Sequence, residues 1–340
     1  MKESKTQQLF RQLRERIESG IYPVGSRFPS EYLLADEFEV NKKTANKAVD
    51  MLVSTGLLRR GTGGAGTVVV KNFEFPRGQI AFFSVPSGYC MRILTGVQKC
   101  ALEYGYAVTV FFPETTDCGE LLASLVNSNV CGFVFCSQFG YLADKTGLPA
   151  VLVDHFPEND SPVDVLNTND HLGGKLMMDE VLRRGHRKIA VYSSGRHYPI
   201  RQFRIAGFME SMRNAGFTSP QKQIFYGTAF DDQSATEALA QILEQEVETS
   251  VIVCDADDAA CSMLKAVRKQ KKEITVTSFG NSLNGADRLA AIEQFPEKLG
   301  SAACRRLMHN IKAGIHSTGY RELIAPQVVY QDEIPVISCN

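Results

Sequence analysis

The sequence predicts a small α+β domain at the N-terminus followed by a larger α/β domain. Residues 28–70 contain two short helical patterns and then a glycine-rich stretch between two short strands, the second of them β-branched. From residue 80 onward, apolar strands alternate with amphipathic helices, which is typical of parallel sheets. Residues 71–79, KNFEFPRGQ, have a proline, a glycine and no strong period, which indicates a linker. The expected domains are therefore residues 1–70 and 80–340, joined by the linker 71–79.

The first domain is expected to contain three helices. An amphipathic helix over residues 5–20 has one apolar face, made of Leu9, Phe10, Leu13 and Ile17. Ser30 can cap the second helix, because its hydroxyl accepts a hydrogen bond from an unpaired backbone amide. Asn41 can cap the third, Lys42–Leu52, whose outward residues are Lys42, Lys43, Asn46 and Lys47. Cationic and amide side chains on one exposed face suit phosphates and base edges in a major groove.

A β-hairpin is expected directly after the third helix. Its strands are predicted over residues 57–60 and 67–70, and the sequence GTGGAG between them supplies a flexible turn. Helix, turn, helix and hairpin in this order predict a winged helix–turn–helix. The turn also fits the G-x-G-x-x-G dinucleotide fingerprint, but that motif must open a helix, and a β-branched strand follows it here.

Charge and composition narrow the possible classes of protein. Residues 1–71 hold twelve Lys/Arg and eight Asp/Glu, a net charge of +4, whereas the remainder carries −5. A basic head on an acidic body favours nucleic acid at one end only. The N-terminus lacks the apolar stretch of a signal peptide, and no run approaches the length of a membrane span. Nine cysteines include no CxxC pair for zinc. We therefore expect a cytoplasmic protein without a membrane, metal or cofactor partner.

Several motifs of the first domain follow one another in the order and spacing of a known family. They are Gln12–Ile17, Gly25–Glu31, Leu34-Ala35, Lys42–Val49 and Gly56–Arg60. Over about its first 70 residues the chain thus resembles the GntR family of bacterial transcription regulators. The resemblance implies that operator DNA contacts Ser30, Glu31, Lys42, Lys43, Thr44, Asn46, Lys47, Gly63 and Gly64. The positions of Lys42 and Asn46 are usually arginine in that family, so the operator sequence cannot be transferred from relatives.

The second domain is expected to form two successive open α/β halves. Strands are predicted at 80–85, 107–112, 132–136 and 150–154, then at 188–193, 223–226, 250–254, 274–279 and 322–330. Helices are expected between them, including one over residues 205–215 and a late one over residues 298–313. Two halves imply two lobes, and ligands of open parallel sheets bind beyond the carboxyl ends of the strands.

A second resemblance covers residues 80–335. The residues Asn169–Gly174, Leu182–Val191 and Arg204–Phe208 are similar to the effector domain of the LacI/GalR type, and Gly185–Ala190 (GHRKIA) is the strongest part. That domain is a two-lobed, type I fold similar to periplasmic sugar-binding proteins. A GntR-type head on a LacI-type body resembles the arabinose-repressor subgroup.

Polar residues that follow the predicted strands are the candidate ligand contacts. A polyhydroxylated ligand needs paired donors and acceptors and a flat apolar wall, because an unpaired buried polar group costs roughly 1–3 kcal/mol. The resemblance and this chemistry together select Tyr89, Asp154, Arg204, Asp257, Asn281 and Gln294. Alternatively, the two aspartates cap the following segments, the arginine pairs with a carboxylate, and the tyrosine packs in a core. Gly280 stands where the family often has an aspartate, and Asn281 is its possible substitute.

The expected function is transcription regulation. We expect a homodimer, formed through the sensor domain, that binds operator DNA. We expect it to repress transcription, with activation as the alternative. A small carbohydrate between the lobes would control it, and a purine or a sugar phosphate remains an alternative effector. An enzyme would need a paired nucleophile and base or a cofactor fingerprint, which the sequence lacks. A transport receptor for carbohydrates is disfavoured by the winged head and by the N-terminal sequence.

Overall fold

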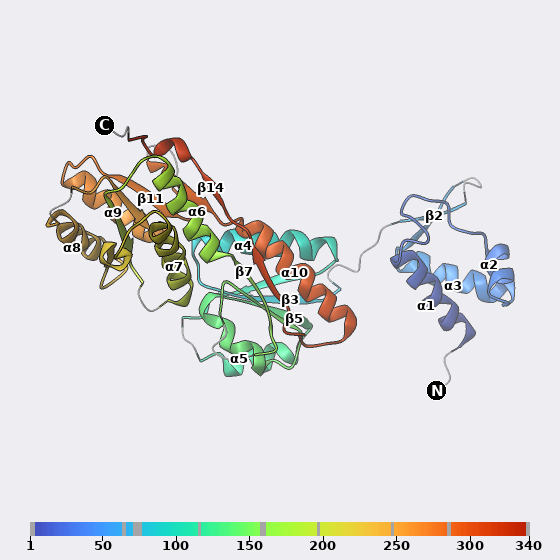
Figure 1. Ribbon diagram of the computed structural model, residues 1–340. Coiled ribbons are helices and arrows are strands. Elements are labelled where there is room, and N and C mark those ends of the chain that lie inside the picture. The colour runs from blue at the N-terminus through green and yellow to red at the C-terminus, as the bar shows by residue number, and fades with distance from the viewer. Residues whose placement is uncertain are drawn as a thin grey trace. The chain divides into compact units, whose positions relative to one another are not determined.

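The computed structural model describes residues 4–62, 66–70, 77–114, 117–156, 161–195, 198–245, 248–283 and 287–337. The chain divides into two compact units, residues 1–78 and residues 79–340 (Figure 1). Within the described residues, no helix combines the length and the apolar character needed to cross a bilayer.

The first unit is the predicted winged helix–turn–helix. It comprises α1 (Lys5–Glu18), α2 (Glu31–Glu37), α3 (Lys42–Ser54), β1 (Leu58–Arg60) and β2 (Thr67–Val69). The side chains of Ser4, Ser30 and Asn41 each accept a hydrogen bond from a backbone amide three residues on, so all three helices are capped. The two strands pair antiparallel, and the apolar faces of the helices close over them in one small core.

The first lobe of the second unit is a six-stranded parallel sheet in the order β13-β7-β6-β5-β3-β4. Its strands are β3 (Gln79–Phe83), β4 (Ala107–Phe111), β5 (Val130–Cys136), β6 (Ala150–Val153), β7 (Asp164–Thr168) and β13 (Arg321–Ile324). Helices α4 (Gly88–Glu103) and α10 (Pro296–Ala313) cover one face, and α5 (Gly119–Val126) packs on the other (Figure 1).

The second lobe contains a second six-stranded sheet, in the order β14-β12-β11-β10-β8-β9. Its strands are β8 (Ile189–Ser193), β9 (Ile224–Tyr226), β10 (Val251–Cys254), β11 (Thr275–Phe279), β12 (Ala291–Glu293) and β14 (Gln327–Val329). Helices α6 (Asp170–Arg183) and α7 (Pro199–Asn214) cover one face. Helices α8 (Asp232–Leu243) and α9 (Asp257–Lys269) cover the other.

The chain crosses between the lobes three times, which corrects the expectation of two successive halves. It passes from β7 to α6, from β12 back to α10, and from β13 to β14. The strand predicted over residues 322–330 is therefore two strands that belong to different sheets. Pro326 stands in the break between them, and proline lacks the amide that a continuing ladder needs. Strands β7 and β12 were not expected, because both are short and polar at their ends.

Two glycines bring α6 and α7 unusually close together. A Cβ atom added at Gly174 would lie 2.1 Å from the backbone oxygen of Arg204, and one at Gly207 would lie 2.2 Å from that of His171. Only glycine tolerates such an approach of two backbones. The contact fixes the first turns of α7 over the start of α6, where the candidate ligand residues lie.

Candidate functional site

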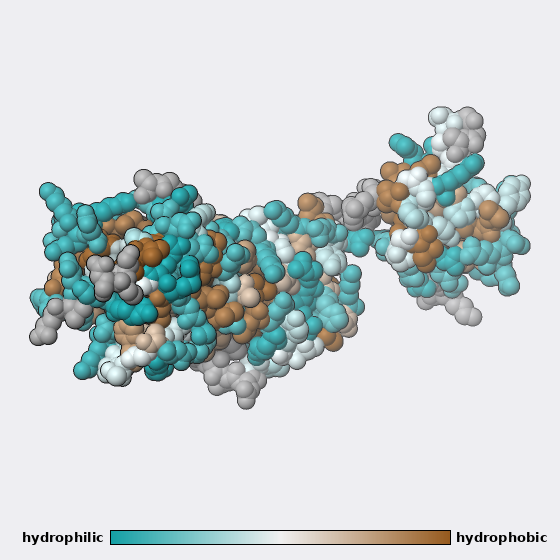
Figure 2. Space-filling model, turned by 45° about the horizontal axis from the view of Figure 1, so that its top comes forward, coloured by the Kyte–Doolittle hydropathy of each residue, from teal (hydrophilic) through white to brown (hydrophobic). Residues whose placement is uncertain are grey.

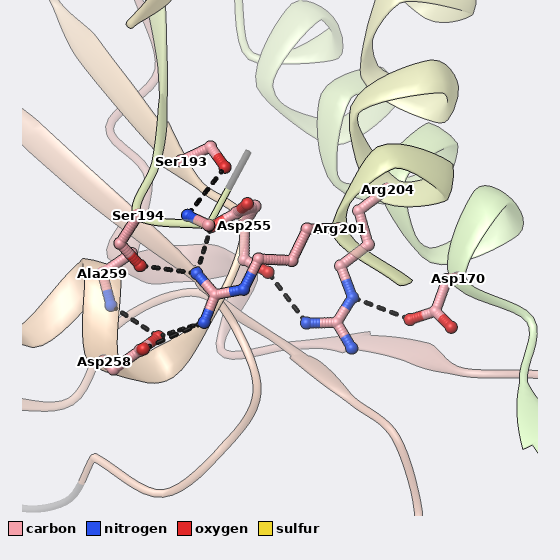
Figure 3. Close-up of polar contacts among 9 residues, drawn as sticks. Asp170, Ser193, Ser194, Arg201, Arg204, Asp255, Asp258 and Ala259 are labelled. Carbon is pink, nitrogen blue, oxygen red and sulfur yellow. Dashed lines mark hydrogen bonds and ion pairs between the residues drawn. The ribbon is translucent and has the colours of Figure 1, made fainter. Parts of the chain in front are cut away.

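Arg204 is the centre of the polar cluster at the carboxyl end of the second sheet. Arg204 lies on α7 and its side chain is buried. Its Nε donates to Oδ1 of Asp170 at 2.7 Å (Figure 3). Its Nη1 donates to the backbone oxygen of Asp255 at 2.8 Å, and its guanidinium lies 4.0 Å from the ring centroid of Phe279. Helix α7 begins at Pro199 rather than at the expected residue 205, because proline is favoured in a first helical turn. Arg204 is thus held rigidly by helix packing.

Two carboxyl groups face Arg204 from the adjoining strand ends. Asp154 follows β6 in a left-handed backbone conformation, with φ of 54°. Burial, and then the charge of Asp170, raise the pKa of Asp154 to about 7, although Arg204 opposes the shift. Burial likewise raises the pKa of Asp170, which opens α6, again against the effect of Arg204. A strained backbone that supports a buried carboxyl group is a frequent feature of binding sites.

Two oxygens in this cluster are left without a donor. Oδ2 of Asp170 and Oδ2 of Asp255 are buried and have no hydrogen-bond partner among the described residues. An unpaired buried acceptor is costly, and hydroxyl groups of a bound molecule are donors that could satisfy both. The cluster is therefore suited to a ligand that is rich in donors.

Arg201 is a member of this cluster that the sequence analysis missed. It lies one helical turn before Arg204 and donates to Oγ of Ser194 at 2.5 Å and to Oδ1 of Asp255 at 3.2 Å (Figure 3). Its Nη2 also reaches both oxygens of Asp258, at 3.0 and 2.9 Å. Two arginines three residues apart lie on one face of any helix that contains both, and this spacing was the available signal. The expected helix, however, began after both arginines.

An aromatic group borders Arg201. The guanidinium lies 5.0 Å from the ring centroid of Phe230, and the ring of Tyr198 meets Phe230 edge-on at 5.5 Å. Phe230 and Tyr198 are 51% and 56% exposed, so a ligand could still cover them. Neither residue was identified from sequence.

The side chains of Tyr89 and Gln294 meet where the chain passes from the second lobe back to the first. Tyr89 lies in the first turn of α4, and Gln294 follows β12 where the chain returns to the first lobe. Nε2 of Gln294 lies 3.5 Å from the hydroxyl oxygen of Tyr89. Burial, and then the charge of Asp154, raise the pKa of Tyr89 well above its usual range.

Asp257 and Asn281 instead make bonds within the protein. Oδ1 of Asp257 accepts from Oγ of Ser278 at 2.6 Å, and Oδ2 accepts from the amide of Ser282 at 3.1 Å. A Cβ at Gly280 would lie 2.4 Å from Oδ2 of Asp257, so the carboxylate of Asp257 fills the space that a side chain at 280 would need. Nδ2 of Asn281 donates to Oε2 of Glu293 at 2.7 Å. Tyr89, Asp154, Arg204 and Gln294 form one neighbourhood, while these two residues brace its edge.

The expected DNA contacts lie mainly on α3 of the first unit. Lys42, Lys43, Asn46 and Lys47 are exposed along this helix, and Thr44 is half-buried among them. Nζ of Lys42 lies 3.7 Å from the ring centroid of Tyr32, while Lys43 and Lys47 form no ion pair with the described residues. Unpaired lysines on an exposed helix face are available to phosphates.

Ser30 and Glu31 lie beside α3, at the start of α2. Ser30 caps that helix, and Glu31 is 3.4 Å from Nη1 of Arg60 in the hairpin. A surface pocket of about 650 Å³ separates this helix start from the hairpin, and Arg27 and Arg60 are among its lining residues. Gly63 and Gly64, expected at the hairpin tip, are outside the described residues.

Comparison with known proteins agrees with both units. Residues 84–340 match the family of periplasmic binding proteins and the sugar binding domain of the LacI family, and residues 5–69 match bacterial regulatory proteins of the gntR family. The chain is 25% identical over 243 residues to the HTH-type transcriptional repressor PurR of Klebsiella pneumoniae, covering 67% of this chain and 71% of that protein. It is 24% identical over 303 residues to the arabinose metabolism transcriptional repressor of Halalkalibacterium halodurans, covering 80% and 79%.

A solved structure shows the same fold as the larger unit. This is a LacI family transcriptional regulator from Enterococcus faecium with bound ribose. The two chains are 15% identical with a TM-score of 0.64, and the match covers 76% of this chain and 100% of that one. The chain therefore belongs to the family of periplasmic binding proteins and LacI-type sugar binding domains, and with its gntR-type head it is a DNA-binding transcriptional repressor of this combined type.

Proposed function

We propose that the chain is a sugar-responsive repressor, whose effector is an uncharged, hydroxyl-rich molecule bound around Arg204. The observation that carries the proposal is the pair of buried carboxylate oxygens, one each on Asp170 and Asp255, that have no donor among the described residues. Sugar hydroxyls are donors that could satisfy both oxygens, and the half-exposed ring of Phe230 offers an apolar face close to Arg201.

The balance of charge argues for a neutral effector rather than a sugar phosphate. Four carboxyl groups, those of Asp154, Asp170, Asp255 and Asp258, surround the two guanidinium groups of Arg201 and Arg204. Both guanidinium groups already pair with carboxylates, so a phosphate would find repulsion and no free cation. The names of two relatives support this choice, since one is a repressor of arabinose metabolism and one has bound ribose.

A purine base is the second candidate. Phe230 offers an exposed ring on which a flat base could stack, and several relatives are PurR repressors. A base would use the ring but leave fewer donors for the two carboxylate oxygens. The two candidates therefore differ in which residue matters more, Phe230 for a base and Asp255 for a sugar.

A panel of ligands tests the effector class directly. Thermal unfolding of the full chain is measured with neutral pentoses and hexoses, with their phosphates, and with guanine and hypoxanthine. A ligand at 100 times its dissociation constant adds about 2.7 kcal/mol to the free energy of unfolding. We expect a neutral sugar to raise the melting temperature and its phosphate to leave it unchanged. Stabilisation by a phosphate or a purine alone would refute the neutral-sugar proposal.

A matched pair of variants assigns the site. Asp255→Asn removes one of the two unpaired acceptors and should abolish the stabilisation by the sugar. Asp287→Asn is the control, because Asp287 pairs with Arg268 on the surface, where both side chains are 53% exposed. Equal stabilisation of both variants by the sugar would place the ligand elsewhere.

Operator binding would involve two copies of the chain. In this proposal α3 of each copy lies in a major groove of a pseudo-palindromic site, and the hairpin lies toward the minor groove. Exposed apolar side chains such as Leu102 on α4 and Leu323 on the edge strand β13 support self-association of the larger unit, whose surface shows apolar areas among hydrophilic ones (Figure 2). Ligand binding would close the lobes and change the separation of the heads, with a coupling free energy of roughly 1–3 kcal/mol.

A further inference from the structure

Arg60 joins the hairpin of the first unit to both helices of the helix–turn–helix. It is the last residue of β1, and its Nη2 donates to Oδ1 of Asp50 at 2.6 Å and to Oδ1 of Asn46 at 3.1 Å, both on α3. Its Nη1 lies 3.4 Å from Oε1 of Glu31 on α2. One guanidinium therefore holds the side chain of Asn46, a residue on the exposed face of the expected recognition helix.

The chemistry of this contact fixes which way the amide of Asn46 points. A guanidinium has donors and no acceptor, so the atom of Asn46 that faces it must be the carbonyl oxygen. The reverse orientation would set an NH₂ group against another N–H donor. The Nδ2 amide of Asn46 is consequently turned away from Arg60 and is the group left to meet DNA.

This orientation has a consequence for base recognition. Asparagine reads adenine with two bonds, accepting from N6 and donating to N7, which requires both amide atoms at the base edge. Oδ1 keeps a second lone pair, but the bond from Arg60 turns Oδ1 toward the hairpin and fixes the plane of the amide, so we expect Nδ2, and not both amide atoms together, to face the base edge. A lone NH₂ group suits guanine or thymine, whose major-groove edges carry acceptors and no donor, whereas adenine offers it one acceptor, N7, beside the competing N6 amino group.

We propose that Arg60 is a specificity-determining positioning residue: by holding Oδ1 of Asn46, it makes Asn46 select guanine or thymine instead of adenine at one position of each half-site. The inference rests on the proposed placement of α3 in the major groove. Arg60 itself reads no base in this account and acts through the amide that it orients.

The test uses the full chain and a pool of randomised double-stranded DNA. Selection with the wild-type protein defines the half-site, and the position at which Asn46→Ala loses its preference identifies the base that Asn46 reads. Affinities for the four base pairs at that position are then compared for the wild type and Arg60→Met. We expect the wild type to prefer guanine or thymine there, and Arg60→Met to change the affinity ratio of guanine to adenine by about tenfold.

Arg59→Met is the matched control. Arg59 precedes Arg60 in the same strand, is exposed, and forms no hydrogen bond or ion pair with α3 among the described residues. It removes the same charge, so it should weaken binding to every sequence alike and leave the base preference unchanged. Asn46→Asp is a second variant, which keeps the side-chain shape but removes the donor, and it should lose the preference for guanine or thymine even if Arg60→Met is unstable.

Three results would count against the inference. A wild-type preference for adenine at the Asn46 position would overturn it. So would an Arg60→Met protein that is folded and loses affinity uniformly, as Arg59→Met does, because Arg60 would then act only as a charge. If the wild-type chain enriches no sequence at all, the proposed DNA contact itself fails, and this inference fails with it.

Discussion

The ring of Phe156 lies 4.8 Å, centroid to centroid, from the ring of Phe203, and the two residues belong to different lobes. Phe156 follows β6 of the first sheet, and Phe203 lies on α7 of the second. Phe156 is close in sequence to Asp154, and Phe203 is next to Arg204, and both of these residues belong to the polar cluster. The aromatic contact therefore joins the lobes beside the candidate effector site.

Phe203→Ala should weaken effector binding. Phe203 is 44% exposed, so its removal should cost little stability, but it deletes an aromatic pair worth about 0.5–1.5 kcal/mol. We expect a rise of roughly 2- to 12-fold in the dissociation constant of the stabilising sugar, measured by calorimetry. Phe112→Ala is the control, since Phe112 is 41% exposed and has no aromatic partner among the described residues. Equal effects of the two substitutions would show that the contact between the lobes does not favour the bound state.

Asp154 should make the protein less stable as the pH rises toward neutrality. Its pKa is raised to about 7 by burial, so between pH 4 and 7 the folded state binds a proton that the unfolded state has released. The free energy of unfolding should therefore fall as the pH rises through this window. Asp154→Asn keeps the left-handed conformation, which asparagine tolerates, and removes the titrating group.

Urea unfolding at pH 5, 6 and 7 measures this effect. The wild type should lose stability relative to Asp154→Asn across the series, with a limiting slope of about 1.4 kcal/mol per pH unit. Parallel curves for the two proteins would mean that Asp154 is ionised throughout.

Asp164 should be a major contributor to the stability of the first lobe. Its carboxylate is fully buried on β7 and accepts from Nε of Arg306 at 2.5 Å, from Nδ2 of Asn310 at 2.8 Å, and from the amides of Thr318 and Tyr320. Burial would raise the pKa of Asp164, but these hydrogen bonds outweigh it and hold the pKa below its usual value. Its stabilising effect is complete above about pH 4 and is lost as the pH falls toward the folded-state pKa.

Asp164→Ala should lower the free energy of unfolding at pH 7 by about 3–5 kcal/mol, because it removes the acceptor of the partly buried Arg306 and of the buried Asn310. The control is Asp287→Ala, which breaks an exposed pair worth at most about 1 kcal/mol. Denaturant titration followed by circular dichroism compares them. A loss below 1 kcal/mol for Asp164→Ala would show that the buried network adds little.

Lys47→Ala should weaken operator binding in a salt-dependent way. Lys47 is exposed on α3 and unpaired among the described residues, so it is free to neutralise a phosphate. Its loss should reduce the slope of log affinity against log salt by about 0.9, as measured by fluorescence anisotropy. Lys269→Ala, on α9 of the other unit, should leave the slope unchanged. Identical slopes for all three proteins would exclude a phosphate contact by Lys47.

The sequence was sufficient to predict the winged head and most elements of the two-lobed body. Strong local signals produced these predictions, such as the Ser30 and Asn41 caps and the periodic apolar faces of the helices. The exchange of strands between the lobes was missed, because the assignment of β13 and β14 to different sheets depends on long-range pairing across Pro326. Nothing local marks which sheet a three- or four-residue strand will join.

The candidate site was predictable only in part. Asp154 and Gln294 could be placed from their positions after strands, whereas Arg201 and Phe230 depend on where α7 begins and on the course of the loop after β9. The hydrogen bonds of Asp257 with Ser278 and Ser282 depend on how its carboxylate packs against Gly280. A periodic pattern in the sequence does not predict such packing. The roles of all these residues in binding remain predictions.

Effector binding in the larger unit should control the affinity of the chain for its operator. Fluorescence anisotropy with the selected operator measures this most directly, with and without a saturating amount of the neutral sugar that best stabilises the protein. We predict a fall in operator affinity of roughly 5- to 150-fold with the sugar, and no fall for Asp255→Asn. Equal operator affinities of the wild type with and without that sugar would contradict the account.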